Sequence, residues 1–196
     1  ARAFVRHLQT GVTRWQDMAR IKDSQPLSPL TVRGYVRALK AFWSWLEEEG
    51  HIEHNPMLRL KQPKAPRKII ETFTKEHIAS MIACLDLEWP NDYRMYTILL
   101  LFLDTGLRLS ELAGLELEDV DLAQSQLRVM GKGSKERVVP FGTQTRRTLH
   151  RYIHAFRFSP LTEYEQHLFL TEAGTPMTAS GIKTSIRPLG PQANIT

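Results

Sequence analysis

The chain has 196 residues, of which 42% are hydrophobic and 24% are charged, a balance that indicates a globular protein and excludes a disordered one. A formal net charge of +5 and a pI near 9.5 favour an anionic partner. No apolar run reaches the roughly 18 residues of a membrane span, and the first residues have no signal-peptide core, so we expect a soluble, cytoplasmic protein without membrane contact.

The positive charge is unevenly distributed along the chain. Residues 1–60 carry nine Lys and Arg against six Asp and Glu, residues 61–70 carry four against none, and residues 71–196 carry thirteen against fifteen. We therefore expect a basic first domain over 1–60, a basic linker over 61–71 and a second domain over 72–196. A basic domain and linker ahead of a nearly neutral domain indicate that the first two lie along a polyanion.

The first domain is predicted to be helical. Residues 1–9 have a helical pattern, and residues 29–49 form the strongest predicted helix, with Ser28 as its cap and Gly50 as its stop. Its apolar side recurs at steps of three and four, which predicts a core face made of Val32, Tyr35, Val36, Leu39, Phe42, Trp43 and Leu46.

A polar row follows the other side of this helix. It consists of Arg33, Arg37, Lys40 and Ser44, spaced so that all four share one face. The row suits contact with a phosphate backbone, although a merely solvated face has the same composition. The acids Glu47–Glu49 lie at the far end of the helix and not beside the cations, which favours DNA.

The linker, KQPKAPRKII, contains two prolines and four cations. The prolines prevent a continuous helix and favour an extended path. We count its cations Lys61, Lys64, Arg67 and Lys68 among the expected DNA contacts.

The second domain opens with three predicted helices, over residues 74–87, 92–104 and 107–115. Thr74 is a candidate cap for the first, and the second is apolar nearly all round, which predicts a central core position. The single cysteine, Cys84, excludes an internal disulfide and is predicted to be buried. Thr105 and Gly106 break the chain between the second and third helices.

Arg108 and Glu111 share a face of the third helix. An arginine beside a small turn is suited to bidentate contact with the two nonbridging oxygens of a phosphodiester. In phosphoryl transfer such a donor stabilises the charge that gathers on those oxygens. A purely structural Arg–Glu pair is the alternative for these two residues taken alone.

Residues 126–130 and 136–141 alternate like strands, and GKGSK joins them as a hairpin. Flanking glycines let Lys132 project from the tip, where its ammonium group suits protonation of a leaving 5′ oxygen without a metal. Lys135 is the competing candidate for this role, and the alternative for the whole turn is that its lysines only make the surface soluble. Thr105, Lys135 and Arg137 complete the expected DNA contacts.

Two spaced motifs, TGLRLSEL and VMGKGSKERVVPFG, resemble the tyrosine recombinase family, the Xer and phage-integrase group. The stretch SPLTVRGYVRALKAFWSWLEEEGHIEHNPMLRLKQPK resembles its core-binding domain, and HLFLTEAGTPMTASGIKTSIRPLG resembles a later part of its catalytic domain. The resemblance implies a mainly α fold with a small β-hairpin or sheet. By this resemblance, the chain consists of a helical, SAM-like core-binding domain and the N-terminal half of an α+β catalytic domain.

The same resemblance implies the roles of the site residues. Arg108 is the first catalytic arginine, Glu111 the supporting acid and Lys132 the hairpin lysine. The two domains embrace double-stranded DNA, and the full-length parent assembles into a synaptic tetramer that cuts and rejoins DNA through a 3′ phosphotyrosyl intermediate. No metal and no cofactor are expected.

The sequence departs from the family pattern after the second motif. The family's His-x-x-Arg box and attacking tyrosine come after the stretch that ends in SIRPLG, and here they are missing, as is the first core-binding helix. His154 and Arg157 spell the box too early, and Tyr152 and Tyr164 also come too early to be the nucleophile. His150 and His154 have metal-ligand spacing without a third partner. We expect a chain truncated at both ends that binds DNA and does not cleave it.

Two other functions remain open. Residues 110–115 resemble the first helix of a helix-turn-helix, which would make the chain a noncatalytic DNA-binding regulator, although Glu116, Glu118, Asp119 and Asp121 are unsuited to a recognition helix. A fragment that serves only as an assembly or inhibitory partner of a full-length recombinase is the other.

Overall fold

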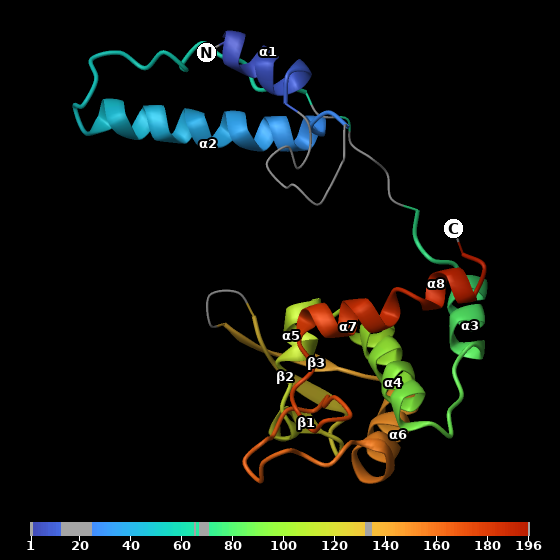
Figure 1. Cartoon of the computed structure of the whole chain (residues 1–196). Coiled ribbons are helices and arrows are strands. Elements are labelled where there is room, and N and C mark those ends of the chain that lie inside the picture. The colour runs from blue at the N-terminus through green and yellow to red at the C-terminus, as the bar shows by residue number, and fades with distance from the viewer. Residues whose placement is uncertain (1, 13–24, 65, 67–70, 132–134, 196) are drawn as a thin grey trace. The chain divides into compact units, whose positions relative to one another are not determined.

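A computed structural model describes residues 2–12, 25–64, 66, 71–131 and 135–195 (Figure 1). The chain divides into two compact units, Ala1–Glu71 and Thr72–Thr196. Helices dominate, with one small antiparallel sheet in the second unit, so the expected mainly α fold is confirmed. Within the described ranges, no helix has the length and apolar composition of a membrane span.

The first unit is built around α2 (Pro29–Glu48), against which the shorter α1 (Arg2–Thr10) packs. The Ser28 hydroxyl caps α2 by accepting the Thr31 N–H at 3.1 Å. Beyond the other end of α2, Gly50 adopts the left-handed backbone conformation, with φ of 73°. The predicted start and stop of this helix are therefore confirmed.

Fewer side chains of α2 are buried than its apolar pattern predicts. Among the described residues of the first unit, the buried apolar side chains are Leu8, Val32, Val36 and Met57. Tyr35 and Phe42, expected on the core face, are 51% and 50% exposed. The nine residues of α1 are too few to cover the apolar side of a twenty-residue helix, so the described part of this unit leaves these rings in solvent.

The second unit begins with α3 (Lys75–Ala83) and α4 (Pro90–Thr105). Thr74 caps α3 as expected, its hydroxyl accepting the His77 N–H at 3.2 Å. Cys84 is exposed, so its predicted burial is wrong. Successive residues on a helix are about 100° apart, and the apolar face of α3 already follows other positions, namely Ile78, Met81, Ile82 and Leu85.

Helix α4 passes through the centre of the second unit, as its apolar sequence predicts. Ile98 and Leu101 on this helix have no exposed surface. They share one core with the side chains of the sheet and of the later helices, including Leu112, Leu127, Leu149, Tyr152, Phe169 and Ile182. This core supports the short elements that carry the candidate site.

The sheet contains β1 (Val120–Asp121), β2 (Gln126–Met130) and β3 (Glu136–Pro140), in that order and antiparallel. The pairing of β2 with β3 confirms the expected hairpin, with Met130 opposite Glu136 nearest its tip and Gln126 opposite Pro140 at the other end. Two residues are too few to show an alternating pattern, so β1 was not expected.

Further helical elements of the second unit, within the described ranges, are α5 (Leu109–Ala113), a 3-10 turn (Leu117–Asp119), α6 (Thr143–Arg151) with a π-helical turn (Tyr152–Phe156), α7 (Ala179–Ile186) and α8 (Leu189–Gln192). Helix α7 lies beside α5 (Figure 1). The stretch HLFLT forms only isolated bridges, from His167 to Glu116 and from Leu170 to Pro176.

Candidate active site

Arg108 occupies the junction between α4 and α5, directly before the first residue of α5. Gly106 ends α4 in the left-handed conformation, with φ of 62°, and the buried Leu107 side chain anchors the turn. Arg108 is in an extended conformation with its side chain 71% exposed. The core thus holds the backbone that presents this arginine to solvent.

Glu111, in the first turn of α5, binds Arg108 in two ways. Its Oε2 accepts the Arg108 backbone N–H at 2.8 Å, and its Oε1 accepts Arg108 Nη1 at 2.8 Å. The first contact gives the backbone N–H at the helix start a partner, as in a capping box. The second contact orients the guanidinium, so one carboxylate caps the helix and positions the arginine.

Arg137 on β3 binds the same carboxylate. Its Nη1 donates to Oε1 at 2.9 Å and its Nη2 donates to Oε2 at 2.8 Å. The Glu111 side chain is only 5% exposed, and that of Arg137 is 40% exposed. We call Arg108, Glu111 and Arg137 the Arg–Glu cluster.

Four donors on two oxygens keep Glu111 ionised. Hydrogen bonds from Arg137, and then from the Arg108 backbone, hold the pKa of the Glu111 carboxyl well below its ordinary value. The same pair raises the pKa of Arg137. The cluster therefore carries two cations and one anion at neutral pH, and the surplus positive charge is on the exposed side.

Arg108 keeps most of its donors for a ligand. A guanidinium has five N–H donors, and the contact between the Arg108 side chain and Glu111 uses one of them. Within the described ranges, Arg108 has no acidic partner besides Glu111. An exposed guanidinium held by a buried carboxylate is preorganised for two oxygens of one phosphate.

The tip end of the β2–β3 hairpin, at Gly131, lies against this cluster. The Gly131 N–H donates to the Lys135 carbonyl at 2.8 Å, and a Cβ on Gly131 would lie 3.2 Å from Arg137 Nη1 and 4.0 Å from Glu111 Oε1. Lys132 is the next residue but lies outside the described residues, so its role as proton donor to the leaving 5′ oxygen stays a prediction. Lys135, the competing lysine, is exposed.

The predicted row on α2 separates into two halves. Arg33 and Arg37 are exposed. Lys40 is half-buried and its Nζ donates to the Leu60 carbonyl at 2.9 Å, while the half-buried Ser44 accepts a hydrogen bond from Asn55 Nδ2 at 3.2 Å. The segment after α2 thus engages the second half, and sequence periodicity alone does not reveal this.

The other expected DNA contacts differ in how available they are. Lys61 and Lys64 of the linker are exposed, whereas Arg67 and Lys68 lie outside the described residues. Thr105 is half-buried and its hydroxyl donates to the Leu101 carbonyl within α4. The Thr105 hydroxyl is therefore occupied within α4, and the residue contributes to the site through its backbone at the end of that helix.

The early His-x-x-Arg sequence has a structural use. Arg157 donates to the main-chain carbonyls of Glu165, His167 and Leu168 at 2.8–3.3 Å. His154 is exposed and its ring lies 4.5 Å from that of His150. Among the described residues, no group of three or more His, Cys, Asp or Glu side chains gathers as a metal site.

Tyr152 is unsuited to nucleophilic attack. The side chain has no exposed surface and its hydroxyl donates to the Leu168 carbonyl at 3.3 Å. Burial raises the pKa of Tyr152 to about 12, so the phenolate is hard to form. Tyr164 is 90% exposed and is not part of the Arg–Glu cluster.

The helix-turn-helix alternative is wrong for this stretch. Helix α5 is followed by a 3-10 turn (Leu117–Asp119) and then by β1, so no recognition helix comes after it. Asp119 instead accepts hydrogen bonds from the Glu116 N–H at 3.0 Å and from Arg128 Nε at 3.1 Å. The acids that are unsuited to a recognition helix thus stabilise a turn.

Sequence reasoning placed Arg137 among the DNA contacts and missed its pairing with Glu111. A signal for the pairing was present, because Arg137 and Val139 are two residues apart and share one face of the predicted strand. In the structure both are half-buried. A charged residue on the inward side of a strand needs a partner of opposite charge, and Glu111 is that partner.

Comparison with known proteins identifies relatives of this chain. Residues 71–196 match the model of the Phage integrase family. Tyrosine recombinase XerC of Oceanobacillus iheyensis is 31% identical over 175 residues, which cover 88% of this chain and 57% of that protein. Tyrosine recombinase XerD of Staphylococcus aureus is 33% identical over 172 residues, which cover 87% of this chain and 58% of that protein.

Solved structures show the same fold at lower identity. The Tn1549 transposon integrase in complex with transposon right end DNA has a TM-score of 0.70 and 23% identity, covering 86% of this chain and 60% of that one. XerA recombinase has a TM-score of 0.56 and 23% identity, covering 87% and 57%. The chain spans less than two thirds of the length of these relatives. Together with the matched family model, these similarities establish that the chain belongs to the phage integrase family of tyrosine recombinases.

Proposed function

We propose that this chain is the DNA-binding part of a site-specific recombinase, with Arg108 as a clamp on the phosphate that is cut. The observation that carries the proposal is the exposed Arg108 guanidinium held by the buried Glu111 carboxylate. The Tn1549 integrase and the lambda integrase were both solved bound to DNA, which supports the choice of ligand. The setting we propose is the cytoplasm.

The chemistry proposed for the whole recombinase is transesterification. A tyrosine hydroxyl loses its proton to solvent and its oxygen bonds to phosphorus, the bond from phosphorus to the 5′ oxygen breaks, and Lys132 gives that oxygen a proton. Arg108 donates to the nonbridging oxygens, where negative charge gathers. Loss of one such donor costs on the order of 10²–10³ in rate. Glu111 keeps the donor in place.

The 196 residues supply half of this site. They contain five tyrosines, none of them after Tyr164, and no His-x-x-Arg sequence comes after the SIRPLG stretch. We propose that this polypeptide binds duplex DNA and forms no covalent link to it. Self-association into a synaptic tetramer belongs, in this proposal, to a protein that also carries the remaining catalytic residues.

Within the proposal, residues 1–60 are the core-binding domain, 61–71 the basic linker and 72–196 part of the catalytic domain, and each domain contacts the duplex. Exposed Arg33 and Arg37 on α2 support a phosphate contact by the first domain, and exposed Lys61 and Lys64 support one by the linker. Lys40 and Ser44, being engaged within the chain, contribute less.

The first prediction concerns affinity. Arg108→Ala is expected to weaken binding to a fluorescein-labelled duplex about threefold to tenfold, because one phosphate contact is lost. The slope of log affinity against log salt should fall by about 0.9, the value for one phosphate. Anisotropy titrations over a salt series measure both quantities.

Arg147→Ala is the matched control for that experiment. Arg147 is also exposed and its replacement changes the net charge equally, but it lies on α6, outside the Arg–Glu cluster. The control should leave affinity and slope nearly unchanged. Equal losses in the two variants would show that Arg108 contributes only charge, and the clamp would have to be abandoned.

The second prediction concerns cleavage. When the 196-residue chain is incubated with a labelled, nicked suicide duplex, no covalent protein–DNA adduct is expected, because the buried Tyr152 is the tyrosine nearest the early His-x-x-Arg sequence and its hydroxyl is engaged. Denaturing gel electrophoresis is the measurement. A labelled adduct would contradict the proposed division of the site, and peptide mapping would then identify the nucleophile.

A further inference from the structure

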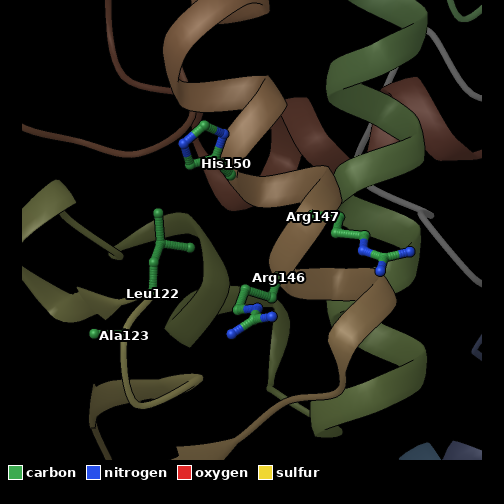
Figure 2. A pocket seen from close by; sticks show the side chains of 5 residues that line it. All are labelled: Leu122, Ala123, Arg146, Arg147 and His150. Atoms are coloured by element: carbon green, nitrogen blue, oxygen red, sulfur yellow. The ribbon is translucent and has the colours of Figure 1, made fainter.

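A second cationic site lies on the outer side of α6. Figure 2 shows a pocket of about 420 Å³ with Leu122 and Ala123 on one side and residues of α6 on the other. We call it the α6 pocket and define it by Leu122, Ala123, Arg146, Arg147 and His150. Arg146 extends toward Leu122 and Ala123, whereas the guanidinium of Arg147 is turned away from them in this view.

The arginines of the α6 pocket differ from most others in the second unit. Six other arginines of this unit each bind an acid or a main-chain carbonyl, namely Arg94, Arg108, Arg128, Arg137, Arg151 and Arg157. Within the described ranges, Arg146 and Arg147 form no ion pair, although both are exposed. Two adjacent unpaired cations beside a pocket offer their charge to a ligand.

The α6 pocket is separate from the Arg–Glu cluster. Leu122 and Ala123 lie in the turn between β1 and β2, and α6 begins just after β3 ends. Both borders are therefore at the Gln126–Pro140 end of the hairpin, opposite the Met130–Glu136 end that leads to Lys132. The four residue steps from Gln126 to Met130 separate the two ends by roughly 13 Å. A ligand in this pocket therefore does not occupy the phosphate position proposed at Arg108.

The surroundings favour a short acidic ligand over a continuous phosphate backbone. Leu122, Ala123 and the aliphatic stem of Arg146 supply apolar surface that a phosphate backbone does not use, whereas a peptide can place an apolar side chain on it.

We propose that the α6 pocket docks a short acidic segment of a partner protein, with an apolar side chain against Leu122 and Ala123. A carboxylate beside that side chain binds Arg146, Arg147 adds positive charge at the border of the pocket, and His150 borders it as a further polar contact. The charge complementarity between two unpaired arginines and an acidic peptide carries the proposal. It does not depend on the function proposed for Arg108, because the two sites lie at opposite ends of the hairpin.

The test uses a labelled peptide of alternating glutamate and leucine, with a matched peptide that has glutamine in place of glutamate. The glutamate peptide is expected to bind and the glutamine peptide to bind about tenfold more weakly. Arg146→Glu in the full chain should weaken binding of the glutamate peptide about tenfold, since reversal replaces attraction with repulsion. Arg187→Glu, an equal charge change beyond α7, should not.

Amide shifts of the unaltered chain provide a check that needs no variant. The glutamate peptide should shift the Leu122 and Ala123 signals and leave those of Arg108 and Glu111 in place. Equal binding of the two peptides, or shifts confined to other residues, would overturn the proposal. So would a loss of duplex DNA affinity in Arg146→Glu tenfold greater than in Arg187→Glu, because the surface would then be a DNA contact.

Discussion

Replacing Glu111 with alanine is expected to lower the free energy of unfolding of the second unit by about 2–3 kcal/mol. The carboxylate is 5% exposed and accepts four hydrogen bonds, two of them from Arg137. Hydrogen bonds to a charged group each stabilise a fold by about 1.5–3 kcal/mol. In the variant, water can hydrogen bond to both arginines, so the net loss is smaller than the sum of the four bonds. Urea unfolding followed by amide signals of the second unit measures the loss.

Glu111→Gln tests the charge separately from the shape. The amide has the size of the carboxylate, but its NH₂ group faces arginine donors, so it should also destabilise the unit. Glu118→Gln is the matched control: Glu118 pairs with Arg128 at 2.9 Å and its side chain is 72% exposed. A surface pair of this kind contributes little, and no measurable change is expected.

The difference between wild type and Glu111→Gln should depend on pH. Hydrogen bonding holds the folded-state pKa of Glu111 well below its ordinary value, whereas the unfolded value is about 4.3. The stabilisation is therefore complete above about pH 5 and is lost as the pH falls below about 4.3 toward the folded pKa. A difference that stayed constant down to pH 2 would show that the charge of Glu111 does not stabilise the fold.

Duplex DNA affinity gives Glu111→Gln a second readout. Removing a negative charge should strengthen binding to DNA if net charge alone decides. If Glu111 positions Arg108, binding should instead weaken, by about fivefold or 1 kcal/mol. The sign of the change thus separates a positioning carboxylate from a merely acidic neighbour of the proposed phosphate position.

The sequence predicted the elements whose patterns are local. Helix α4 is apolar on nearly every side and lies in the core, and β2 and β3 pair in the expected hairpin because their alternation and the intervening glycines specify both strands and the turn. Arg108 and Glu111, three residues apart, also meet as expected. In each case the residues that determine the structure belong to one continuous short segment of the chain.

Contacts between distant segments were not predicted. Arg137 binds Glu111 across 26 residues, and Lys40 binds the Leu60 carbonyl across 20. Periodicity identifies which face a side chain is on but not what the chain places there later. Periodicity therefore predicted four equivalent DNA contacts along α2. In the fold, Lys40 and Ser44 form hydrogen bonds within the chain, and Arg33 and Arg37 stay exposed.

Replacing Gly174 with alanine is expected to destabilise the second unit more than any surface substitution, by about 3–4 kcal/mol. Gly174 is buried with φ of 74°, a conformation that costs an L-residue about 1–2 kcal/mol. A Cβ there would also collide with the Ser159 carbonyl oxygen and lie 2.5 Å from the Leu161 nitrogen. These are main-chain atoms, so relief requires the backbone to move, and overpacking of this kind costs about 1–3 kcal/mol.

Gly106→Ala is the matched control, because it has the same backbone conformation without the crowding. Its φ is 62° and nothing lies within 4 Å of its added Cβ, so only the conformational cost of about 1–2 kcal/mol is expected.

Hydrogen exchange of the Leu168 and Met177 amides measures the stability of this core in both variants. These amides donate to the Leu115 and Phe169 carbonyls at 2.7 and 2.9 Å. Because Leu161 also donates to the Gly174 carbonyl at 2.9 Å, a backbone shift in Gly174→Ala loses that bond as well. Equal losses in the two variants would mean that the loop moves freely, and that close packing of residues 159–161 on Gly174 does not stabilise the core behind the Arg–Glu cluster.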